Sequence, residues 1–473
     1  MYQLSGLDTS FLNLETPNQH MHIGSVVILD PSTAETPFTI DTLRQLIKQR
    51  IHLVPTFRRK LVKVPFNIDF PYWIDDPNFD LDFHLRHVAV PAPGGLTQLA
   101  DLVSRIYGRP LDRNQPLWEL YMIEGLGDIP EIGSGKIALL GKFHHAAIDG
   151  ASGAEILASM IDLSPQMRPV PPPEQPFAPE PAPNELQLLF KSLSPVLRRP
   201  YRLATLVPQL VRAAREIGHE ALSKQTVDVP PLPFTAPRTS FNTTISPHRR
   251  FAALNISLAR AKAVKNKAGC KLNDVVLAVV SGALRRYLQG RGELPDRPLI
   301  SLCPISVRSE EDRKSAGNQV SLMRVNLATD VADAKKRLEQ IMASTQQGKA
   351  RHKTIGAKAL QDWNDFATPS VAALAARLVV RAKIADRMNP LFNLVITNVP
   401  GSPVPIYLGG ARMIANYGTA PIIDGVGLMI VVTSYINRLD FGLTVCKEAV
   451  PEVWDVALAL REAMDELTDT LSA

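Results

Sequence analysis

Hydrophobic positions in the first third of the chain form both short strand-like runs and helix-like stripes. Residues 21–29 (MHIGSVVIL) and 136–143 (KIALLGKF) are short apolar runs that favour buried strands. Apolar residues recur at helical spacing in residues 38–50, from Gly94 onwards, and in residues 151–163. The pattern predicts an α/β domain whose last strand leads almost directly into a helix.

The second half has a pattern of the same kind, without a clean internal repeat. Residues 273–288 (NDVVLAVVSGALRRYL) predict a helix with Asn273 placed to cap its start. Residues 331–347 and 451–471 predict two further helices. Strand-like runs occur at residues 299–307, 319–327, 391–398, 428–435 and 439–445. A second α/β domain is therefore expected.

A change of composition separates the two halves. Residues 165–183 are dominated by proline, which predicts an extended linker. Residues 186–217 then combine apolar residues at helical spacing with prolines and many arginines. This basic stretch suits either an anionic membrane surface or a helical cover packed on the second domain. We expect an N-terminal domain at 1–165, a linker and helical crossover at 166–248, and a C-terminal domain at 249–473.

Composition adds limits to this picture. A chain of 473 residues is too long for one ordinary core. The net charge of +6 suits anionic partners such as a phosphate-bearing substrate or a membrane surface. No basic patch interleaved with aromatic residues is present, so nucleic acid is not favoured as a partner. Cys270, Cys303 and Cys446 are too far apart to indicate a disulfide framework or a cysteine-rich metal site.

Targeting signals are not evident in the sequence. The start, MYQLSGLDTSF, lacks the basic and apolar regions of a secretory signal. No apolar run reaches the roughly 18–20 residues needed to span a bilayer. We therefore expect a cytoplasmic protein that is at most peripheral to a membrane.

The densest group of proton-active side chains is HHAAIDG, residues 144–150, at the expected strand-to-helix junction. Successive side chains on a strand point to opposite faces, so only one of His144 and His145 can face a given cleft. Asp149 precedes the helix, where a carboxylate can meet free backbone N–H groups or a cation. Gly150 permits a sharp turn. The motif predicts one working histidine, one supporting histidine and one structural aspartate.

Two other interpretations of this motif remain open from the residues alone. The histidines could be satisfied core residues, or they could bind a transition metal. The spacing differs from the HExxH pattern, and no third ligand is evident nearby. Acid–base chemistry is the interpretation that these residue types favour over metal binding.

HHAAIDG matches the HHxxxDG signature of the superfamily that contains chloramphenicol acetyltransferase, plant acyltransferases and peptide-synthetase condensation domains. The remainder of the chain resembles the bacterial wax ester synthase/diacylglycerol acyltransferase family. The segments that carry the resemblance are LDTSFLNLET (7–16), MHIG (21–24), FRRKLVKVP (57–65), LDRNQPLWEL (111–120), NDVVLAVVSGALRRYL (273–288), PISVR (304–308), GNQVS (317–321) and TNVPGSPVPIYLGGA (397–411). They run nearly end to end and keep the order of the family.

The resemblance implies a two-domain α/β fold like that of chloramphenicol acetyltransferase, with a channel between the domains. It implies acyl-CoA as a co-substrate, diacylglycerol or a long-chain alcohol as the acceptor, and neither a bound cofactor nor a metal. His145 would be the general base, with His144, Asp149 and Gly150 in supporting roles. An enzyme of this kind would work at a peripheral membrane or lipid-droplet surface; its oligomeric state does not follow from the sequence.

The implied chemistry agrees with the residues. An alcohol becomes a good nucleophile when a base removes its proton, and a neutral imidazole suits that task near neutral pH. A thioester is already an activated acyl donor. The tetrahedral oxyanion needs hydrogen-bond donors, for which Asn273 is a candidate, the alternative being its role as a helix cap.

Further segments of the resemblance suggest architecture more than chemistry. Arg308 would anchor a loop or meet a phosphate, and Met429 stands where relatives often have asparagine, which weakens the transfer of substrate contacts. The residues expected to line the channel or support it are Pro116, Leu117, Trp118, Asp274, Asn318 and Asn398.

Other functions remain possible on the sequence alone. A relative could use a different alcohol or an amine as acceptor. A lipid-binding protein with a degenerate site and a metal-dependent hydrolase are competitors from other classes. The preferred acceptor and the acyl length depend on the shape of the channel, which the sequence does not disclose.

Overall fold

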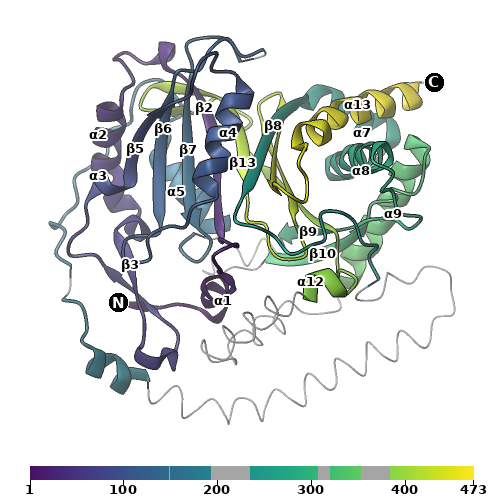
Figure 1. Cartoon of the computed structure of the whole chain (residues 1–473). Coiled ribbons are helices and arrows are strands. Elements are labelled where there is room, and N and C mark those ends of the chain that lie inside the picture. The colour runs from purple at the N-terminus through teal and green to yellow at the C-terminus, as the bar shows by residue number, and fades with distance from the viewer. Residues whose placement is uncertain are drawn as a thin grey trace.

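The computed structural model describes residues 1–130, 132–148, 150–179, 181–192, 235–306, 320–352 and 384–472. These residues form a mixed α/β structure with two six-stranded sheets and one small three-stranded sheet (Figure 1). The fold class expected from the sequence is therefore confirmed.

The first sheet holds the end of the strand that carries the histidines. Its strand order is β12-β13-β2-β7-β6-β5. β7 is central and pairs antiparallel with both β2 and β6. The strands are β2 (His22–Asp30), β5 (Leu85–Ala89), β6 (Trp118–Glu124), β7 (Ile137–His144), β12 (Tyr407–Leu408) and β13 (Ala411–Thr419).

Helices bury both faces of the first sheet. Leu43 and Ile47 of α2 share a core with Leu139 of β7 on one face. On the other face, α4 packs between the first sheet and β8 of the second half (Figure 1). The helices of this half are α1 (Gly6–Leu14), α2 (Ile40–Arg50), α3 (Leu81–His84), α4 (Leu96–Tyr107) and α5 (Gly150–Met160). Short 3-10 turns lie at Pro31–Thr33, Ile51–Leu53, Pro55–Arg58 and Pro65–Asn67.

The small sheet has the order β1-β4-β3 and lies beside the first sheet. Its strands are β1 (Tyr2–Gln3), β3 (Arg59–Val62) and β4 (Tyr72–Asp75).

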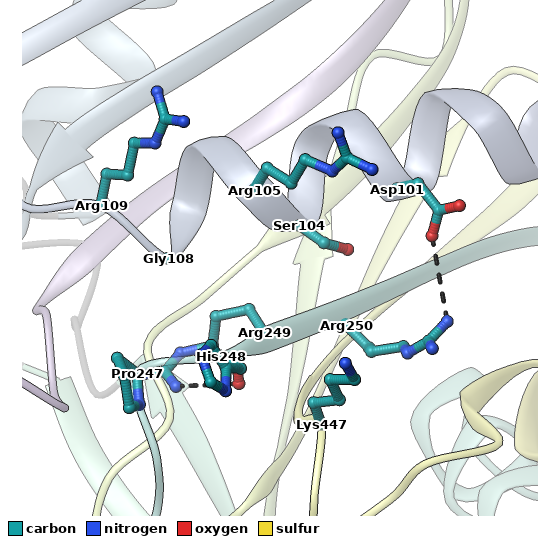
Figure 2. A pocket seen from close by; sticks show the side chains of 10 residues that line it. All are labelled: Asp101, Ser104, Arg105, Gly108, Arg109, Pro247, His248, Arg249, Arg250 and Lys447. Carbon is teal, nitrogen blue, oxygen red and sulfur yellow. Dashed lines mark hydrogen bonds and ion pairs between the residues drawn. The ribbon is translucent and has the colours of Figure 1, made fainter.

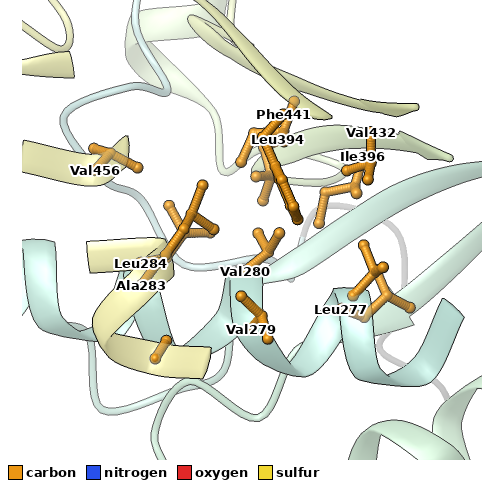
Figure 3. Packing of buried hydrophobic residues seen from close by; sticks show 14 of the residues in the cluster. Leu277, Val279, Val280, Ala283, Leu284, Leu394, Ile396, Val432, Phe441 and Val456 are labelled. Atoms are coloured by element: carbon orange, nitrogen blue, oxygen red, sulfur yellow. The ribbon is translucent and has the colours of Figure 1, made fainter. Parts of the chain in front are cut away.

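The second sheet has the order β10-β9-β11-β14-β15-β8 and is covered by long helices. Leu277, Val280 and Leu284 of α8 pack against Ile396 and Phe441 of the sheet (Figure 3). Its strands are β8 (Arg249–Ser257), β9 (Ile300–Ser306), β10 (Val320–Asn326), β11 (Leu394–Pro400), β14 (Leu428–Tyr435) and β15 (Arg438–Cys446). The helices are α7 (Leu258–Ala268), α8 (Leu272–Gly290), α9 (Ala334–His352), α12 (Ile384–Arg387) and α13 (Val453–Ser472).

One segment of the C-terminal half belongs to the first sheet. β13 pairs antiparallel with β2, from Arg412 opposite Asp30 to Thr419 opposite Gly24. β13 also lies against β14 and β15 of the second sheet. At this crossing a Cβ on Gly442 would lie 1.9 Å from the carbonyl oxygen of Gly418, so both backbones need the space that glycine leaves. A division at residue 249 therefore places β13 in the C-terminal half of the chain, although β13 belongs to the first sheet.

Local patterns predicted most elements well. The expected strand at 428–435 is β14, and the expected helix at 273–288 lies within α8. Of the expected helical stretch 186–217, residues 186–192 are helical and residues 193–217 lie outside the described part. All three cysteines are free and buried. Among the described helices, none combines the length and the apolar character that a membrane span requires.

Candidate active site

The two histidines lie where β7 ends. The backbone N–H of His144 donates to the carbonyl of Leu117 (3.0 Å), and that of His145 donates to the carbonyl of Met21 (2.8 Å). The N–H of Ala147 then donates back to the carbonyl of His144 (2.9 Å) and closes a turn. These bonds fix the motif to both neighbouring strands, so its side chains start from a rigid backbone.

The ring of His144 is engaged at both nitrogens. Its Nδ1 accepts the backbone N–H of Ala146 at 3.0 Å, and its Nε2 lies 3.3 Å from Oε1 of Glu15. Because a backbone N–H can only donate, Nδ1 carries no proton, and the proton of neutral His144 is on Nε2, facing the carboxylate. His144 is 1% exposed. This geometry is that of a supporting histidine.

Glu15 joins the motif to the segment LDRNQPLWEL (111–120). Its carboxylate accepts from Nε of Arg113 (3.0 Å) and also from the Nη2 of the same guanidinium. Arg113 donates in addition to the carbonyl of Leu12 at the end of α1. Burial alone would raise the pKa of Glu15, but the contacts with His144 and Arg113 outweigh it and hold that pKa well below its ordinary value. Glu15 is therefore a fixed negative charge beside the motif.

His145 has a different environment from its neighbour. Its ring stacks on the ring of Phe11, with centroids 4.1 Å apart and planes 14° apart. The side chain is partly exposed, whereas His144 is buried. An aromatic wall of this kind fixes the plane of the imidazole. His145 thus has both a set orientation and access.

Three buried side chains, His20, His22 and Lys142, lie next to the motif. His22 faces His144 in the β2–β7 register, and the rings of His20 and His22 stack at 5.2 Å. Burial lowers the pKa of both His20 and His22, the latter well below its ordinary value. Burial also lowers the pKa of Lys142, whose ammonium donates to the carbonyl of Arg109 at 2.7 Å. The neutral imidazoles of His20 and His22 therefore lie near the ionised Glu15.

Pro116, Leu117 and Trp118 support this arrangement from the core. Pro116 and Leu117 are buried, and Leu117 packs with Ala146 of the motif. Trp118 is 2% exposed, stacks between Phe57 and His84, and donates from its indole N–H to the carbonyl of Phe57 at 2.9 Å.

Two asparagines meet in the second half. Nδ2 of Asn398, on β11, lies 3.4 Å from Oδ1 of Asn273 in the first turn of α8. The helix cap expected at Asn273 is wrong, because Lys271 is the N-cap residue and α8 begins at Leu272. Asp274 instead serves the helix start: its carboxylate accepts from the N–H of Lys271 (3.0 Å) and from the hydroxyl of Thr345 (2.8 Å). Asp274 is structural, and Asn273 keeps its side chain for other contacts.

Other residues expected from the sequence are less closely defined. Asp149, Arg308 and Asn318 lie outside the described residues. Gly150 is the first residue of α5. Met429 lies on β14, partly buried against the second core. In the part of the chain that is described, no three histidine, cysteine or acidic side chains are arranged to hold a metal ion.

Residues 15–22, the segment that covers the motif, also contact the second half. The carbonyl of Asn18 accepts from the guanidinium of Arg249, and the side chain of Gln19 accepts from the N–H of Asp424 at 3.0 Å. Glu15 and His22 lie on either side of these two residues in sequence. The motif therefore lies close to the junction of the two halves.

Comparison with known proteins agrees with this arrangement. Residues 4–276 match the model of the wax ester synthase/diacylglycerol acyltransferase catalytic domain, and residues 316–468 match the model of the C-terminal domain of the same proteins. The chain belongs to the wax ester synthase/diacylglycerol acyltransferase family. It is thus an acyltransferase of a family that uses acyl-CoA.

Individual members of the wax ester synthase/diacylglycerol acyltransferase family cover almost the whole chain. A Mycobacterium tuberculosis protein named a probable diacylglycerol O-acyltransferase is 34% identical over 469 residues, covering 97% of each chain. A second M. tuberculosis protein, also assigned by name to the diacylglycerol O-acyltransferases, is 35% identical over 469 residues, covering 99% of this chain and 90% of its own. Both confirm the family that the motifs suggest.

Solved structures show the same fold. The wax ester synthase/diacylglycerol acyltransferase from Marinobacter aquaeolei VT8 superposes with a TM-score of 0.69, at 26% identity and full coverage of both chains. A starter condensation domain of rhizomide synthetase, in complex with C8-CoA and Leu-SNAC, has a TM-score of 0.56 at 14% identity, covering 100% of this chain and 94% of its own. The second similarity concerns the fold alone.

Sequence reasoning missed several residues of the site. Glu15 and Phe11 belong to LDTSFLNLET, His22 to MHIG, and Arg113 to LDRNQPLWEL. Each of these segments carried the resemblance, yet none suggested a role. Glu15, Phe11 and His22 contact residue 144 or 145, and Arg113 contacts Glu15. These contacts join positions far apart in sequence, which no local pattern can reveal.

Proposed function

We propose that this protein transfers the acyl group of acyl-CoA to the hydroxyl of diacylglycerol and so makes triacylglycerol, with His145 as the general base. The names of the M. tuberculosis relatives support diacylglycerol as the acceptor. The observation that carries the assignment of the base is the contrast between the two histidines. His144 is 1% exposed and held by the N–H of Ala146 and the carboxylate of Glu15, whereas His145 is partly exposed and stacks on Phe11.

The reaction needs two proton transfers through His145 and no redox partner. The acceptor oxygen attacks the thioester carbonyl carbon while His145 takes the hydroxyl proton. The tetrahedral intermediate then collapses, the carbon–sulfur bond breaks, and the proton passes from His145 to the CoA thiolate. General base catalysis of this kind typically contributes a factor of roughly 10²–10⁴.

Asn273 is our candidate donor to the oxyanion. Its Oδ1 accepts from Asn398, so its N–H₂ group points to the other side of the amide and can donate. Asn273 also lies in the first turn of the 19-residue helix α8, where free backbone N–H groups favour a developing negative charge. These two features support a role for Asn273 in stabilising the intermediate.

The decisive experiment is a transfer assay with purified enzyme, one acyl-CoA and diacylglycerol. We expect thiol release to require the acceptor and to match triacylglycerol formation one to one. Thiol release without acceptor, abolished by a chelator, would instead indicate a metal-dependent hydrolase. Binding of acyl-CoA and diacylglycerol without turnover would indicate a lipid-binding protein.

We propose long-chain alcohols as second acceptors. The name of the Marinobacter relative includes wax ester synthase, and a long-chain alcohol offers the same nucleophile as diacylglycerol. Competition between diacylglycerol, monoacylglycerol and hexadecanol for one acyl-CoA gives the ratio of their kcat/KM values. Exclusive use of diacylglycerol would contradict this part of the proposal.

We also propose that the enzyme works at a membrane or lipid-droplet surface. Phe66 is 83% exposed in the turn Pro65–Asn67, next to the exposed Lys63. Leu186 and Phe190 are 65% and 72% exposed on the helical residues 185–192. Leu188 of the same helix packs against Val64 and Tyr72, close to Phe66 in sequence. Exposed apolar side chains flanked by lysine suit insertion between anionic headgroups. Most of the basic stretch that first suggested a membrane lies outside the described residues.

Flotation with phosphatidylglycerol vesicles tests this surface. Phe66→Asp combined with Phe190→Asp should remove most vesicle binding and leave the turnover of soluble short-chain substrates unchanged. Leu458→Asp is the matched control, because Leu458 is 54% exposed on α13 in the other half. Equal binding of all variants would reject the proposed surface.

A further inference from the structure

A basic cavity lies at the junction of the two halves, apart from the histidine motif. It has a volume of about 580 Å³ and is open to solvent. The end of α4 and the residue Arg109 that soon follows it form one wall, and the residues leading into β8 form the other, with Lys447 from the end of β15 beside them (Figure 2). Its size falls within the range of ligand sites, about 300–1,000 Å³.

The cavity carries a strong excess of positive charge. Its lining includes Arg105, Arg109, Arg249, Arg250 and Lys447 but a single carboxylate, Asp101. Arg250 lies 3.9 Å from Asp101, a distance too long for a strong ion pair. For Arg105 and Lys447, no ion pair occurs within the described part of the chain. Neighbouring cations repel one another, and an anionic ligand would offset this repulsion, so the site favours an anionic ligand.

Arg249 has a separate, structural task in this wall. Its guanidinium donates to the carbonyls of Ser246 and Asn18 and is 8% exposed. It thereby ties the second half to the segment that covers the motif. The cations that remain for a ligand are Arg105, Arg109, Arg250 and Lys447.

The cavity adjoins the elements that carry the histidines. Its residue Gly108 makes a backbone hydrogen bond with His20, which stacks on His22. The carbonyl of its residue Arg109 accepts from Lys142, two residues before His144 on β7. An elongated substrate could therefore have one end in the cavity and the other at the motif.

We propose that this cavity binds the phosphate groups of acyl-CoA, with Arg105, Arg250 and Lys447 as their partners. The inference rests on the proposed function, in which only one substrate carries permanent charge. Diacylglycerol, alcohols and the acyl chain are uncharged, whereas CoA has a diphosphate and a 3′-phosphate, separated from the thioester by the pantetheine arm. Guanidinium and ammonium groups are the usual partners of phosphate oxygens.

A comparison of two acyl donors, acyl-CoA and an S-acyl-pantetheine, distinguishes phosphate binding from a structural role of these cations. We expect Arg105→Gln/Lys447→Gln to raise KM for acyl-CoA by tenfold or more, since each charged hydrogen bond lost is substantial. The same variant should keep its kcat/KM for an S-acyl-pantetheine, which lacks the phosphates. Lys262→Gln on the exposed face of α7 is the matched control and should leave both donors unaffected. Equal losses with both donors, or no change with either, would overturn the proposal.

Binding measurements without turnover keep the inference separate from the proposed function. Titration calorimetry with adenosine 3′,5′-bisphosphate should give binding by wild type and by Lys262→Gln, and at least tenfold weaker binding by the double variant. If that pattern holds while no acyl transfer occurs, the proposed function fails and the cavity assignment stands. If the double variant instead loses binding to phosphatidylglycerol vesicles while keeping its affinity for the bisphosphate, the cavity is a headgroup site and the proposal is wrong.

Discussion

The two halves of this protein each have a six-stranded sheet covered by helices, but the proposed mechanism assigns them different chemistry. The first sheet ends in titratable side chains: His144 and His145 with the ionised Glu15 close by. The second half presents uncharged amides, Asn273 and Asn398, at the start of α8 and near the end of β11. The first group can move a proton, and the second can only hold a charge that forms elsewhere. In the proposed mechanism, the two halves therefore have separate tasks.

Removal of the imidazole of His145, the proposed general base, is the strongest test of this difference between the halves. We expect His145→Ala to lower kcat by roughly 10²–10⁴-fold, because the acceptor hydroxyl then lacks its base. His87→Ala is the control, since His87 is 44% exposed on β5, the edge strand two positions from β7. Circular dichroism should show both variants folded. Full activity of His145→Ala with diacylglycerol would refute the mechanism.

Removal of the charge-holding group tests the other half of the comparison. Asn273→Ala should lower kcat by roughly 10²-fold or more, as is usual for a lost oxyanion donor. Unlike a change at His145, it should leave the shape of the pH–rate profile unchanged, because an amide does not titrate. Asn398→Ala should have a smaller effect through the orientation of the Asn273 amide. A double variant no worse than Asn273→Ala would show that the two asparagines act as a unit.

The same contrast shows what a sequence can and cannot predict here. The elements β7, α5, α8 and β14 follow from apolar periodicity, which is local. The membership of β13 in the first sheet does not follow, because the pattern of a strand does not specify its partner. Asn273 resembled a cap because an amide precedes an apolar run, but the backbone turns into the helix at Lys271 and uses Asp274. Glu15 was missed because it lies 129 positions before His144 and only the fold brings the two together.

Glu15 offers a finer test of the first half. We expect Glu15→Gln to lower kcat by about tenfold, since His144 and Arg113 each lose one charge-assisted partner while the shape of the side chain is kept. Loss of the negative charge disfavours a protonated imidazole nearby, so the acid limb of the rate profile should move to lower pH. Glu124→Gln, at a carboxylate 44% exposed beside His87, is the matched control. An unchanged acid limb would limit Glu15 to holding α1 in place.

The smallest effect expected is on stability, and it arises from the neutral histidines behind Glu15. Burial lowers the pKa values of His20 and His22 below their ordinary 6.5, so both are neutral when folded and take up protons on unfolding in mild acid. The unfolded state then binds more protons, and the free energy of unfolding should fall as the pH drops below about 6.5. His22→Gln should flatten this dependence between pH 6.5 and 5, as measured by urea denaturation at each pH. No flattening would mean that His22 is already protonated in the fold. Asn398 in the second half carries an amide, which does not titrate, so Asn398→Ala should shift stability equally at both pH values.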